Sequence, residues 1–285
     1  MPSSELESLR GALCLVTGGA GFIGSHIVDG LRSAGAQVRV LDNFSTGFRR
    51  NLEHLQDDTG VEIVEGDASD PDVVASAMRD VNVVFHEAAM ASVPRSMRQP
   101  ELCHAWCATS TVALLRAAAA GSVRRFVLAS TSAAYGDSPF VSKREVDPVA
   151  PLSPYAAAKL AAESYCQSFY RGFGLETVVL RYFNVFGPRQ DPQSEYSAVI
   201  PRFVSMILSG SPPIIYGDGQ QSRDFVFVSD VVKANLLAAT VAGVAGGTFN
   251  IARGERTTLL ELLTTLGSVL SQEIEPIFEP PRRGD

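Results

Sequence analysis

A short apolar run, a glycine-rich turn and a second apolar run near the N-terminus constrain the fold of this chain more than any other stretch. Residues 13–16 have the length and apolar character of a buried strand, and apolar residues with helical spacing follow the turn at 17–24. A second apolar run at 37–41 ends on Asp42. This order predicts a strand, a tight turn, a helix and a parallel strand, the first unit of a doubly wound α/β sheet.

The spacing of the glycines in the turn favours a dinucleotide site. Gly18, Gly21 and Gly24 allow a tight turn, close approach of the backbone to a pyrophosphate, and close packing of helix on strand. The amide groups at the start of the helix would bind the phosphates. Asp42 follows Gly24 by 18 positions, and its carboxylate suits ribose hydroxyls but repels a 2′-phosphate. The pattern therefore favours NAD over NADP.

Composition restricts the class of protein. A chain of 285 residues with 46% hydrophobic content can bury one large core, or one core and a smaller lobe. The net charge of −7 argues against a nucleic-acid or anionic membrane surface. The four cysteines lack CxxC spacing, which favours core thiols in a reducing compartment over a metal site. Because no run reaches the ~18 apolar residues of a membrane span, we expect a cytoplasmic protein.

Apolar runs at 61–64, 81–85, 126–129 and 176–180 predict further strands of the same sheet. Asp67 follows the first of these runs and should lie at the ligand edge, where it can meet the adenine amino group. The alternative is that Asp67 caps the helix that begins near Pro71. Ala88 and Ala89 follow the next run; their small size lets a flat cofactor approach the backbone, although tight packing explains it equally well.

Tyr155 and Lys159 stand four positions apart in an expected helix, so their side chains share one face. A nearby ammonium lowers the pKa of a phenol, which would make Tyr155 a workable acid and base. Thr131, at the end of the fifth predicted strand, can hold a substrate hydroxyl. A tyrosine and a lysine at this spacing are common by chance, but Tyr155 and Lys159 follow a hydroxyl cluster and a dinucleotide-binding turn. The combination indicates a redox site.

The ordered motifs of the chain resemble those of the UDP-sugar 4-epimerases, in the extended, nucleotide-sugar branch of the short-chain dehydrogenase/reductase superfamily. They are the turn at 17–24, Gly66-Asp67, Ala88-Ala89, the cluster at 130–132 before Tyr135-Gly136, Tyr155 with Lys159, and 181–184. The resemblance implies tightly held NAD, with Tyr155 as acid/base, Lys159 on the nicotinamide ribose and Thr131 orienting the sugar. Ser132 and Ala133 stand where related 4,6-dehydratases carry Asp-Glu, so dehydration is disfavoured.

The same resemblance, with the residue patterns above, gives two sets of predicted contacts. The expected cofactor contacts are Gly18, Gly21, Phe22, Ile23, Gly24, Asp42, Asn43, Asp67, Ala68, Ala88, Ala89, Tyr155, Lys159 and Phe183. The expected substrate contacts are Ala91, Ser92, Thr131, Ser132, Asn184, Ala198, Val199, Phe203, Arg223 and Arg282. In the family the two arginines hold the UDP phosphates, a task that suits a bidentate guanidinium.

The chain is expected to form two domains. Residues 1–183 should make most of the NAD-binding Rossmann domain, and 184–285 most of a UDP-sugar-binding α/β lobe, with a return to the first domain around 225–250. The resemblance implies a homodimer packed through the helices expected at 100–120 and 154–172. In relatives, a further segment follows the position of Arg282 and forms part of the sugar pocket wall.

One helix departs from the family pattern. Cys107, Ser110 and Ala113 stand where the family usually has Asn, Gly and Asn, and the first Asn touches the cofactor region. A thiol offers fewer donors than an amide, so we expect Cys107 to affect cofactor retention or activity.

The predicted function is NAD-dependent 4-epimerisation of a UDP-hexose. Small Ser197 and Ala198 leave room for an N-acetyl group, so UDP-Glc/UDP-Gal and UDP-GlcNAc/UDP-GalNAc both stay open. One alternative is a UDP-glucuronate epimerase or decarboxylase, for which Arg95 is the candidate cation. Another is a catalytically silent protein that binds NAD or a nucleotide sugar.

Overall fold

The computed structural model describes residues 6–140, 142–192 and 198–280, and the chain divides into two compact units. Unit 1 contains the described residues up to Tyr182 and the segment Val228–Ile251. Unit 2 contains the described residues of Phe183–Phe227 and those from Ala252 onward. That unit 1 binds the cofactor and unit 2 the sugar nucleotide stays a prediction.

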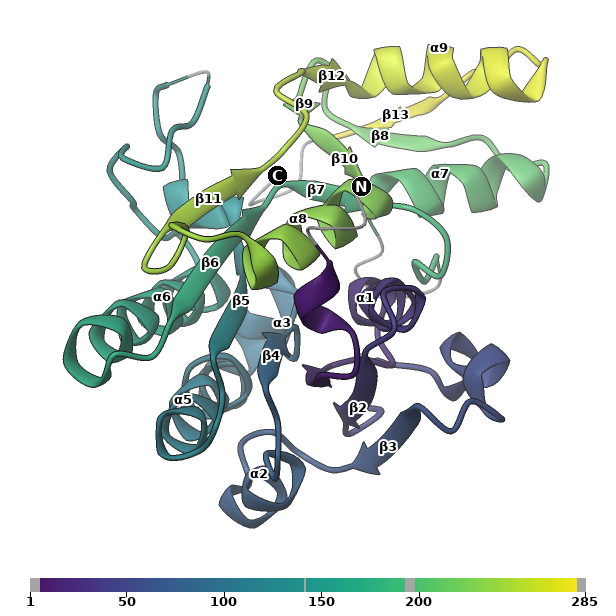
Figure 1. The fold of residues 1–285 in the computed structure, drawn as a ribbon. Coiled ribbons are helices and arrows are strands. Elements are labelled where there is room, and N and C mark those ends of the chain that lie inside the picture. The colour runs from purple at the N-terminus through teal and green to yellow at the C-terminus, as the bar shows by residue number, and fades with distance from the viewer. Residues whose placement is uncertain (1–5, 141, 193–197, 281–285) are drawn as a thin grey trace. The chain divides into compact units, whose positions relative to one another are not determined.

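Unit 1 is built on a seven-stranded parallel sheet with the order β11-β6-β5-β4-β1-β2-β3 (Figure 1). Its strands are β1 (Leu13–Thr17), β2 (Gln37–Asp42), β3 (Val61–Glu65), β4 (Val83–His86), β5 (Arg125–Thr131), β6 (Thr177–Tyr182) and β11 (Thr248–Ile251). Strand order reverses between β1 and β4, and the carboxyl ends of strands at such a point form a ligand crevice. The prediction of a doubly wound parallel sheet is confirmed.

Helices cover this sheet in two groups. They are α1 (Phe22–Ser33), α2 (Pro71–Ala77), α3 (Val93–Arg98), α4 (Pro100–His104), α5 (Ser110–Ala120), α6 (Pro154–Phe173) and α8 (Val228–Thr240). Helix α1 packs against α8, whereas α5 packs against α2 and α6 (Figure 1). Apolar side chains of α2, α5 and α6 bury a core with Leu15, Val84 and Phe126 of the strands. Single-turn 3₁₀ helices lie at Glu7–Leu9, Arg49–Asn51, Glu53–Leu55 and Ser132–Tyr135.

Three helical predictions need correction. The single helix expected at 100–120 is divided by a π-helical turn, Ala105–Thr109, between α4 and α5. The sequence also favours Asp230 as the cap of the helix that follows it, but α8 already begins at Val228, so Asp230 lies inside the helix. The sequence predicts one short helix at 49–56, whereas the structure has two separate 3₁₀ turns there.

Local capping fixes where α6 begins and ends. The Ser153 hydroxyl accepts a hydrogen bond from the backbone N–H of Ala156, and Pro154 occupies the first helical position. Gly174 ends the helix in the left-handed conformation with φ of 71°. These signals place Tyr155 in the first turn of α6.

A buried ion pair ties α6 to the sheet. Arg181 of β6 donates to both carboxylate oxygens of Glu163, at 3.0 and 2.7 Å, and Ser130 of β5 donates to the same carboxylate. Arg181 also donates to the Tyr135 hydroxyl at 2.9 Å. Because every charge in this pair is hydrogen-bonded, the network fixes the register of α6 on β5 and β6.

Unit 2 is smaller and rests on short strands. Its elements are β7 (Asn184–Phe186), α7 (Val199–Leu208), β8 (Ile214–Tyr216), β9 (Ser222–Arg223), β10 (Phe225–Phe227), β12 (Thr257–Thr258), α9 (Leu259–Leu270) and β13 (Ile277–Glu279). Strand β7 pairs with β10 and β8 with β13 in parallel, whereas β9 and β12 are antiparallel. Phe203, Ile215 and Leu262 belong to its core.

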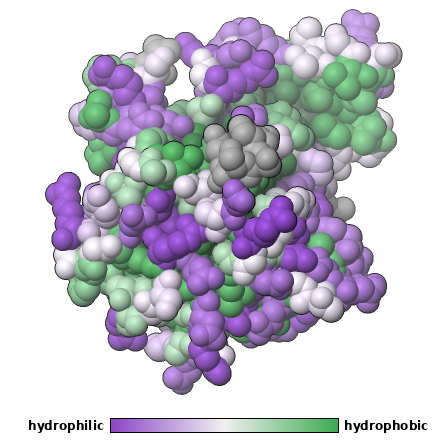
Figure 2. Space-filling view, in the orientation of Figure 1, coloured by the Kyte–Doolittle hydropathy of each residue, from purple (hydrophilic) through white to green (hydrophobic). Residues whose placement is uncertain are grey.

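The surface of unit 2 carries apolar residues near the ends of α7 and α9 (Figure 2). Leu208 and Val269 are among the most exposed large hydrophobic side chains there. In the part of the chain that the structure describes, no helix has the length and apolar character to cross a membrane. Over the same residues, no cluster of His, Cys, Asp or Glu could hold a metal ion.

Candidate functional site

The turn between β1 and α1 requires glycine at two positions. Gly18 has a φ of +67°, and a Cβ on it would lie 2.8 Å from the Ala88 backbone nitrogen. A Cβ on Gly24 would lie 2.2 Å from the Gly18 carbonyl oxygen. Gly21 precedes α1 without a capping side chain from the described residues, so the first amide groups of Phe22 and Ile23 face no side-chain acceptor. Such a cradle fits a pyrophosphate.

Asp42 lies at the carboxyl end of β2 and is buried. Its Oδ2 accepts the Ala20 N–H at 2.9 Å and its Oδ1 accepts the Phe44 N–H at 2.8 Å. Burial raises the pKa of Asp42, while these two hydrogen bonds oppose the rise. An ionised carboxylate has about four acceptor positions, so the described residues leave one open on each oxygen. Asp42 therefore fits two ribose hydroxyls, and with the glycine turn it fits NAD.

Asp67 follows β3, and its carboxylate accepts hydrogen bonds from several neighbouring groups. Its Oδ1 accepts two hydrogen bonds from Ser69, and its Oδ2 accepts them from Trp106 and Asn43. The alternative in which Asp67 caps α2 is wrong, because the Asp70 side chain accepts the N–H groups of Asp72 and Val73. The neighbour Ala68 is buried in the core of unit 1.

The three predicted catalytic side chains come together where β5 ends. The Thr131 hydroxyl lies beside the phenol of Tyr155, where it acts to lower the pKa of that phenol. Lys159, which is 2% exposed, donates from Nζ to the Ala129 carbonyl at 2.7 Å. Ala89 packs in the same apolar cluster as Tyr155, and its neighbour Ala88 lies against Gly18. The acid/base candidate and the glycine turn therefore share one edge of the sheet.

The expected acidity of Tyr155 is not what this structure shows. Burial raises the pKa of Tyr155 above its ordinary value, and charges at Cys107 and Glu87 raise it further. The neighbouring Thr131 hydroxyl opposes this rise in pKa. The prediction that Lys159 makes this phenol acidic is wrong here, because burial and the neighbouring charges both raise the pKa of Tyr155.

Cys103 and Cys107 pack beside Tyr155, in a cluster with Met90 and Ala158. Both thiols are fully buried. The neighbouring Cys103 thiol holds the pKa of Cys107 below its ordinary value, because it can donate to a thiolate there. Lys159 and a backbone hydrogen bond from Met90 act in the same direction, whereas burial opposes them. The departure from the family pattern at Cys107 thus lies next to the catalytic candidates.

The remaining predicted residues of unit 1 have separate positions. Ser132 begins the 3₁₀ turn after β5, and its neighbour Thr131 caps that turn. The Ser92 hydroxyl accepts the Arg95 N–H at 3.2 Å and caps α3. Ala91 is exposed just before it. Their substrate contacts stay predictions.

Unit 2 holds the other predicted substrate residues and Phe183. The backbone N–H of Asn184 donates to the Asp224 carbonyl, where β7 meets β10. Ala198 precedes α7, and Val199 and Phe203 pack with the core of the unit. Arg223 donates from Nη1 to the Ser222 carbonyl at 3.0 Å. Arg282 and Ser197 lie outside the described residues.

Sequence reasoning missed two residues at this edge. Trp106 reaches Asp67 from the π-helical turn, 39 positions along the chain. Glu87, between β4 and Ala88, accepts a hydrogen bond from Tyr182 at 2.9 Å. A charged residue directly before the two small alanines was the available signal for Glu87; no local pattern marks Trp106.

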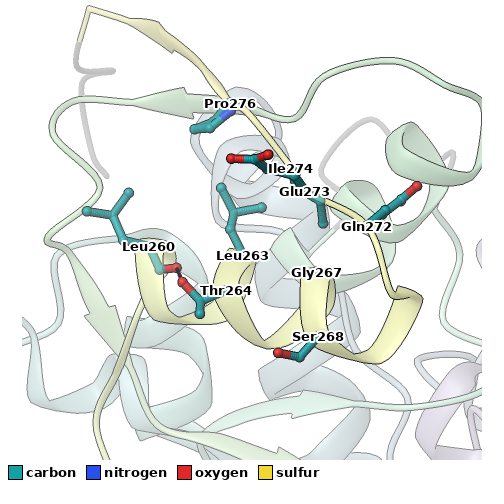
Figure 3. Close-up of a pocket in the computed structure, with 9 residues that line it drawn as sticks. All are labelled: Leu260, Leu263, Thr264, Gly267, Ser268, Gln272, Glu273, Ile274 and Pro276. Atoms are coloured by element: carbon teal, nitrogen blue, oxygen red, sulfur yellow. Dashed lines mark hydrogen bonds between the residues drawn. The ribbon is translucent and has the colours of Figure 1, made fainter.

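A separate cavity of about 490 Å³ lies within unit 2, between α9 and the segment that follows it (Figure 3). Its lining includes Leu260, Leu263, Gly267, Ile274 and Pro276. None of the predicted site residues lines it.

The sequence profile of the NAD dependent epimerase/dehydratase family matches residues 14–252 of the chain. UDP-glucose 4-epimerase from Mycolicibacterium smegmatis is 40% identical over 273 residues, which is 95% of this chain and 87% of that protein.

Two solved structures are similar over nearly the whole chain. One is UDP-N-acetylglucosamine 4-epimerase from Methanobrevibacter ruminantium in complex with UDP-N-acetylmuramic acid, with 40% identity and a TM-score of 0.92, covering 97% of this chain and 87% of that one. The other is UDP-glucose 4-epimerase from Thermus thermophilus in complex with NAD, with 39% identity and a TM-score of 0.86, covering 96% and 88%. The chain belongs to the NAD dependent epimerase/dehydratase family.

Proposed function

We propose that this chain interconverts the C4 epimers of a UDP-hexose with NAD as its cofactor. The observation that carries the proposal is the convergence of Thr131, Tyr155 and Lys159 at the edge of the sheet that also holds the glycine turn. A proton acceptor beside a dinucleotide site is what oxidation of a secondary alcohol requires.

Each side chain has a defined task in this reaction. The Tyr155 phenolate removes the proton of the sugar 4-hydroxyl, and the phenol returns a proton when the 4-keto sugar is reduced on its other face. Thr131, whose hydroxyl lies beside the Tyr155 phenol, orients that hydroxyl. Lys159 uses one of its three N–H donors on Ala129, so two remain for the nicotinamide ribose. Bound NAD supplies the hydride acceptor and, in its oxidised form, a positive ring charge that lowers the pKa of a neighbouring phenol.

The UDP group is proposed to supply most of the binding energy. A guanidinium has five N–H donors, and Arg223 uses one of them on Ser222, which leaves donors for a diphosphate. Arg282 and Asn184 are the other proposed phosphate contacts, and Phe183 is proposed to pack by the nicotinamide. Binding through UDP leaves the sugar free to turn over between the two hydride transfers.

The proposed sugar site accepts both plain and N-acetylated hexoses. Ala198, at the start of α7, has a small side chain, and an N-acetyl group needs extra room. The relatives described above are named for UDP-glucose and for UDP-N-acetylglucosamine, which supports both substrate classes.

The test is incubation of the purified protein with UDP-glucose, UDP-galactose and their N-acetylated counterparts, followed by separation of the products. We expect interconversion within both pairs. Formation of a 4-keto-6-deoxy sugar would contradict the proposal, because Ser132 and Ala133 offer no acid for the loss of water. Failure to convert any of the four would overturn it, and conversion of the plain pair alone would overturn the broad sugar site.

Turnover of UDP-glucuronate is less well supported. The proposed carboxylate partner, Arg95, lies with its guanidinium 5.1 Å from the centroid of the Trp106 ring and donates to the Gln99 side chain at 3.0 Å. Including UDP-glucuronate in the same panel tests this alternative, and we expect no product from it.

We also propose a cytoplasmic homodimer that packs through the two long helical segments. On α6, Tyr165 and Phe173 are exposed, and Phe173 stacks on Phe169 at 4.6 Å between ring centroids. An apolar helix face of this kind suits a partner helix. All four cysteines are free thiols, as in a reducing compartment. Light scattering of the purified protein tests the dimer, and a monomer would contradict it.

A further inference from the structure

The carboxylate of Asp67 already has four hydrogen-bond donors. Ser69 donates its backbone N–H and its hydroxyl to Oδ1, at 2.8 and 2.7 Å. Trp106 Nε1 and Asn43 Nδ2 donate to Oδ2, at 2.9 and 3.3 Å. An ionised carboxylate offers about four acceptor positions. Asp67 therefore has no position left for the amino group of a purine.

Asp42, the second carboxylate at this edge of the sheet, is different. It receives only two donors from the described residues, one on each oxygen. One acceptor position on each oxygen is therefore open to a ligand. The sequence predicts that both acids contact the cofactor, but their environments differ. Asp42 can accept a hydrogen bond from a dinucleotide, whereas Asp67 cannot accept one without losing a donor.

Trp106, one of the two donors to Oδ2 of Asp67, is held in place by its neighbours. Trp106 belongs to the π-helical turn Ala105–Thr109, a local geometry that is frequent at functional sites. The Arg95 guanidinium lies over its indole ring, and Arg95 is itself fixed by Gln99. Burial raises the pKa of Asp67, but the bonds from Ser69, Trp106 and Asn43 outweigh it and leave that pKa below its ordinary value. The carboxylate thus stays charged, and its oxygens stay occupied.

We propose that Trp106 is a specificity-determining residue of the cofactor site: by filling Oδ2 of Asp67, its indole N–H takes the place that the adenine amino group would otherwise have. This inference rests on the proposed function, because it requires a dinucleotide on the glycine turn. It predicts that the amino group at C6 of the purine adds little to the affinity. Asp42 and the glycine turn then account for recognition at the adenosine end.

The experiment compares NAD with nicotinamide hypoxanthine dinucleotide, which carries a carbonyl oxygen in place of the amino group. Calorimetric titration measures the affinity of both for the wild-type protein and for Trp106→Phe. The affinities of the wild type for the two dinucleotides should differ by no more than about three-fold. This is less than the contribution of one hydrogen bond to a charged group. In Trp106→Phe, Oδ2 is open to the amino group, so the preference for NAD should rise to about ten-fold or more.

Asp42→Asn is the matched control. This change removes the charge from the ribose acceptor, so it should weaken the binding of both dinucleotides equally. The ratio of their two affinities should stay within about three-fold. Trp106 is the single tryptophan of the chain, so its emission gives an independent binding signal in the wild type. Because a merely structural role of Trp106 would weaken both ligands alike, the ratio separates the two roles.

Two results would overturn the inference and leave the proposed function intact. One is a wild-type preference for NAD of about ten-fold or more, which would mean that the amino group displaces Asn43 from Asp67. The other is an unchanged ratio in Trp106→Phe. Failure of the wild type to bind either dinucleotide would overturn the proposed function, and this inference with it.

Discussion

Tyr182 donates its phenolic hydrogen to Oε1 of Glu87 across 2.9 Å, at the carboxyl-terminal edge of the central sheet. Asn235 of α8 donates in turn to the Tyr182 oxygen at 2.7 Å. Burial raises the pKa of Glu87 to about 7, although the hydrogen bond from Tyr182 and the charge of Lys159 oppose the rise. Glu87 therefore changes charge near neutral pH, and its charge acts on Tyr155.

The first prediction concerns the pH dependence of stability. The folded state binds the Glu87 proton more tightly than the unfolded chain, whose pKa is the ordinary 4.5. The contribution of this proton to the free energy of unfolding is fully present below pH 4.5 and is lost as the pH rises to about 7. Glu87→Gln cannot ionise and keeps an acceptor for Tyr182. Relative to this variant, the wild type should lose roughly 3 kcal/mol over that range.

Urea unfolding from about pH 5 to pH 8 measures this difference. Glu101→Gln, at an exposed position on α4, is the control and should keep the wild-type dependence. Parallel stability curves for the wild type and Glu87→Gln would contradict the account.

The second prediction concerns the glycine turn. In Gly24→Ala, the new methyl group meets the Gly18 carbonyl oxygen at 2.2 Å, and backbone must shift. We expect a loss of about 1–3 kcal/mol in unfolding free energy and a fall of about ten-fold or more in NAD affinity. Thermal unfolding and calorimetric titration measure the two effects.

Gly172→Ala is the matched control for this change. Gly172 lies in α6, and a Cβ there has no neighbour within 4 Å. The variant should be more stable by about 0.5–1 kcal/mol, because alanine restricts the unfolded chain. Equal NAD affinities for Gly24→Ala and Gly172→Ala would show that the turn does not bind the cofactor.

The third prediction concerns Cys107. A charge on this sulfur raises the pKa of Tyr155 in addition to the effect of burial. Cys107→Ala removes that charge, so the acidic limb of the kcat/KM profile should move to lower pH. The pH dependence of UDP-galactose turnover measures the shift. Cys14→Ala, in β1, should leave the profile unchanged, and equal profiles for the wild type and Cys107→Ala would contradict the prediction.

The sheet and its glycine turn could be predicted from the sequence, because local signals determine them. Apolar runs of strand length and glycines at 18, 21 and 24 leave few alternative folds. The start of α6 was equally predictable, since Ser153 and Pro154 form a local cap. From these local signals alone, without knowledge of tertiary contacts, Tyr155, Lys159 and Thr131 could be predicted to lie at one edge of the sheet.

The electrostatics of the site could not be predicted in the same way. The pKa of Tyr155 depends first on burial, which no local pattern reports. The bond from Trp106 to Asp67 joins residues 39 positions apart, and it depends on a π-helical turn inside a segment with ordinary helical periodicity. Such features follow from packing between elements, so they are seen only in the folded chain.

The central claim is that the Tyr155 phenol carries the proton of the epimerised hydroxyl group. Tyr155→Phe keeps the ring and removes that oxygen, whereas Tyr170→Phe makes the same change on the exposed side of α6. The decisive measurement is the rate of conversion of UDP-galactose to UDP-glucose, with UDP affinity measured in parallel. We predict that Tyr155→Phe loses about 100-fold or more in rate at unchanged UDP affinity, while Tyr170→Phe is unaffected. A wild-type rate in Tyr155→Phe would contradict the claim.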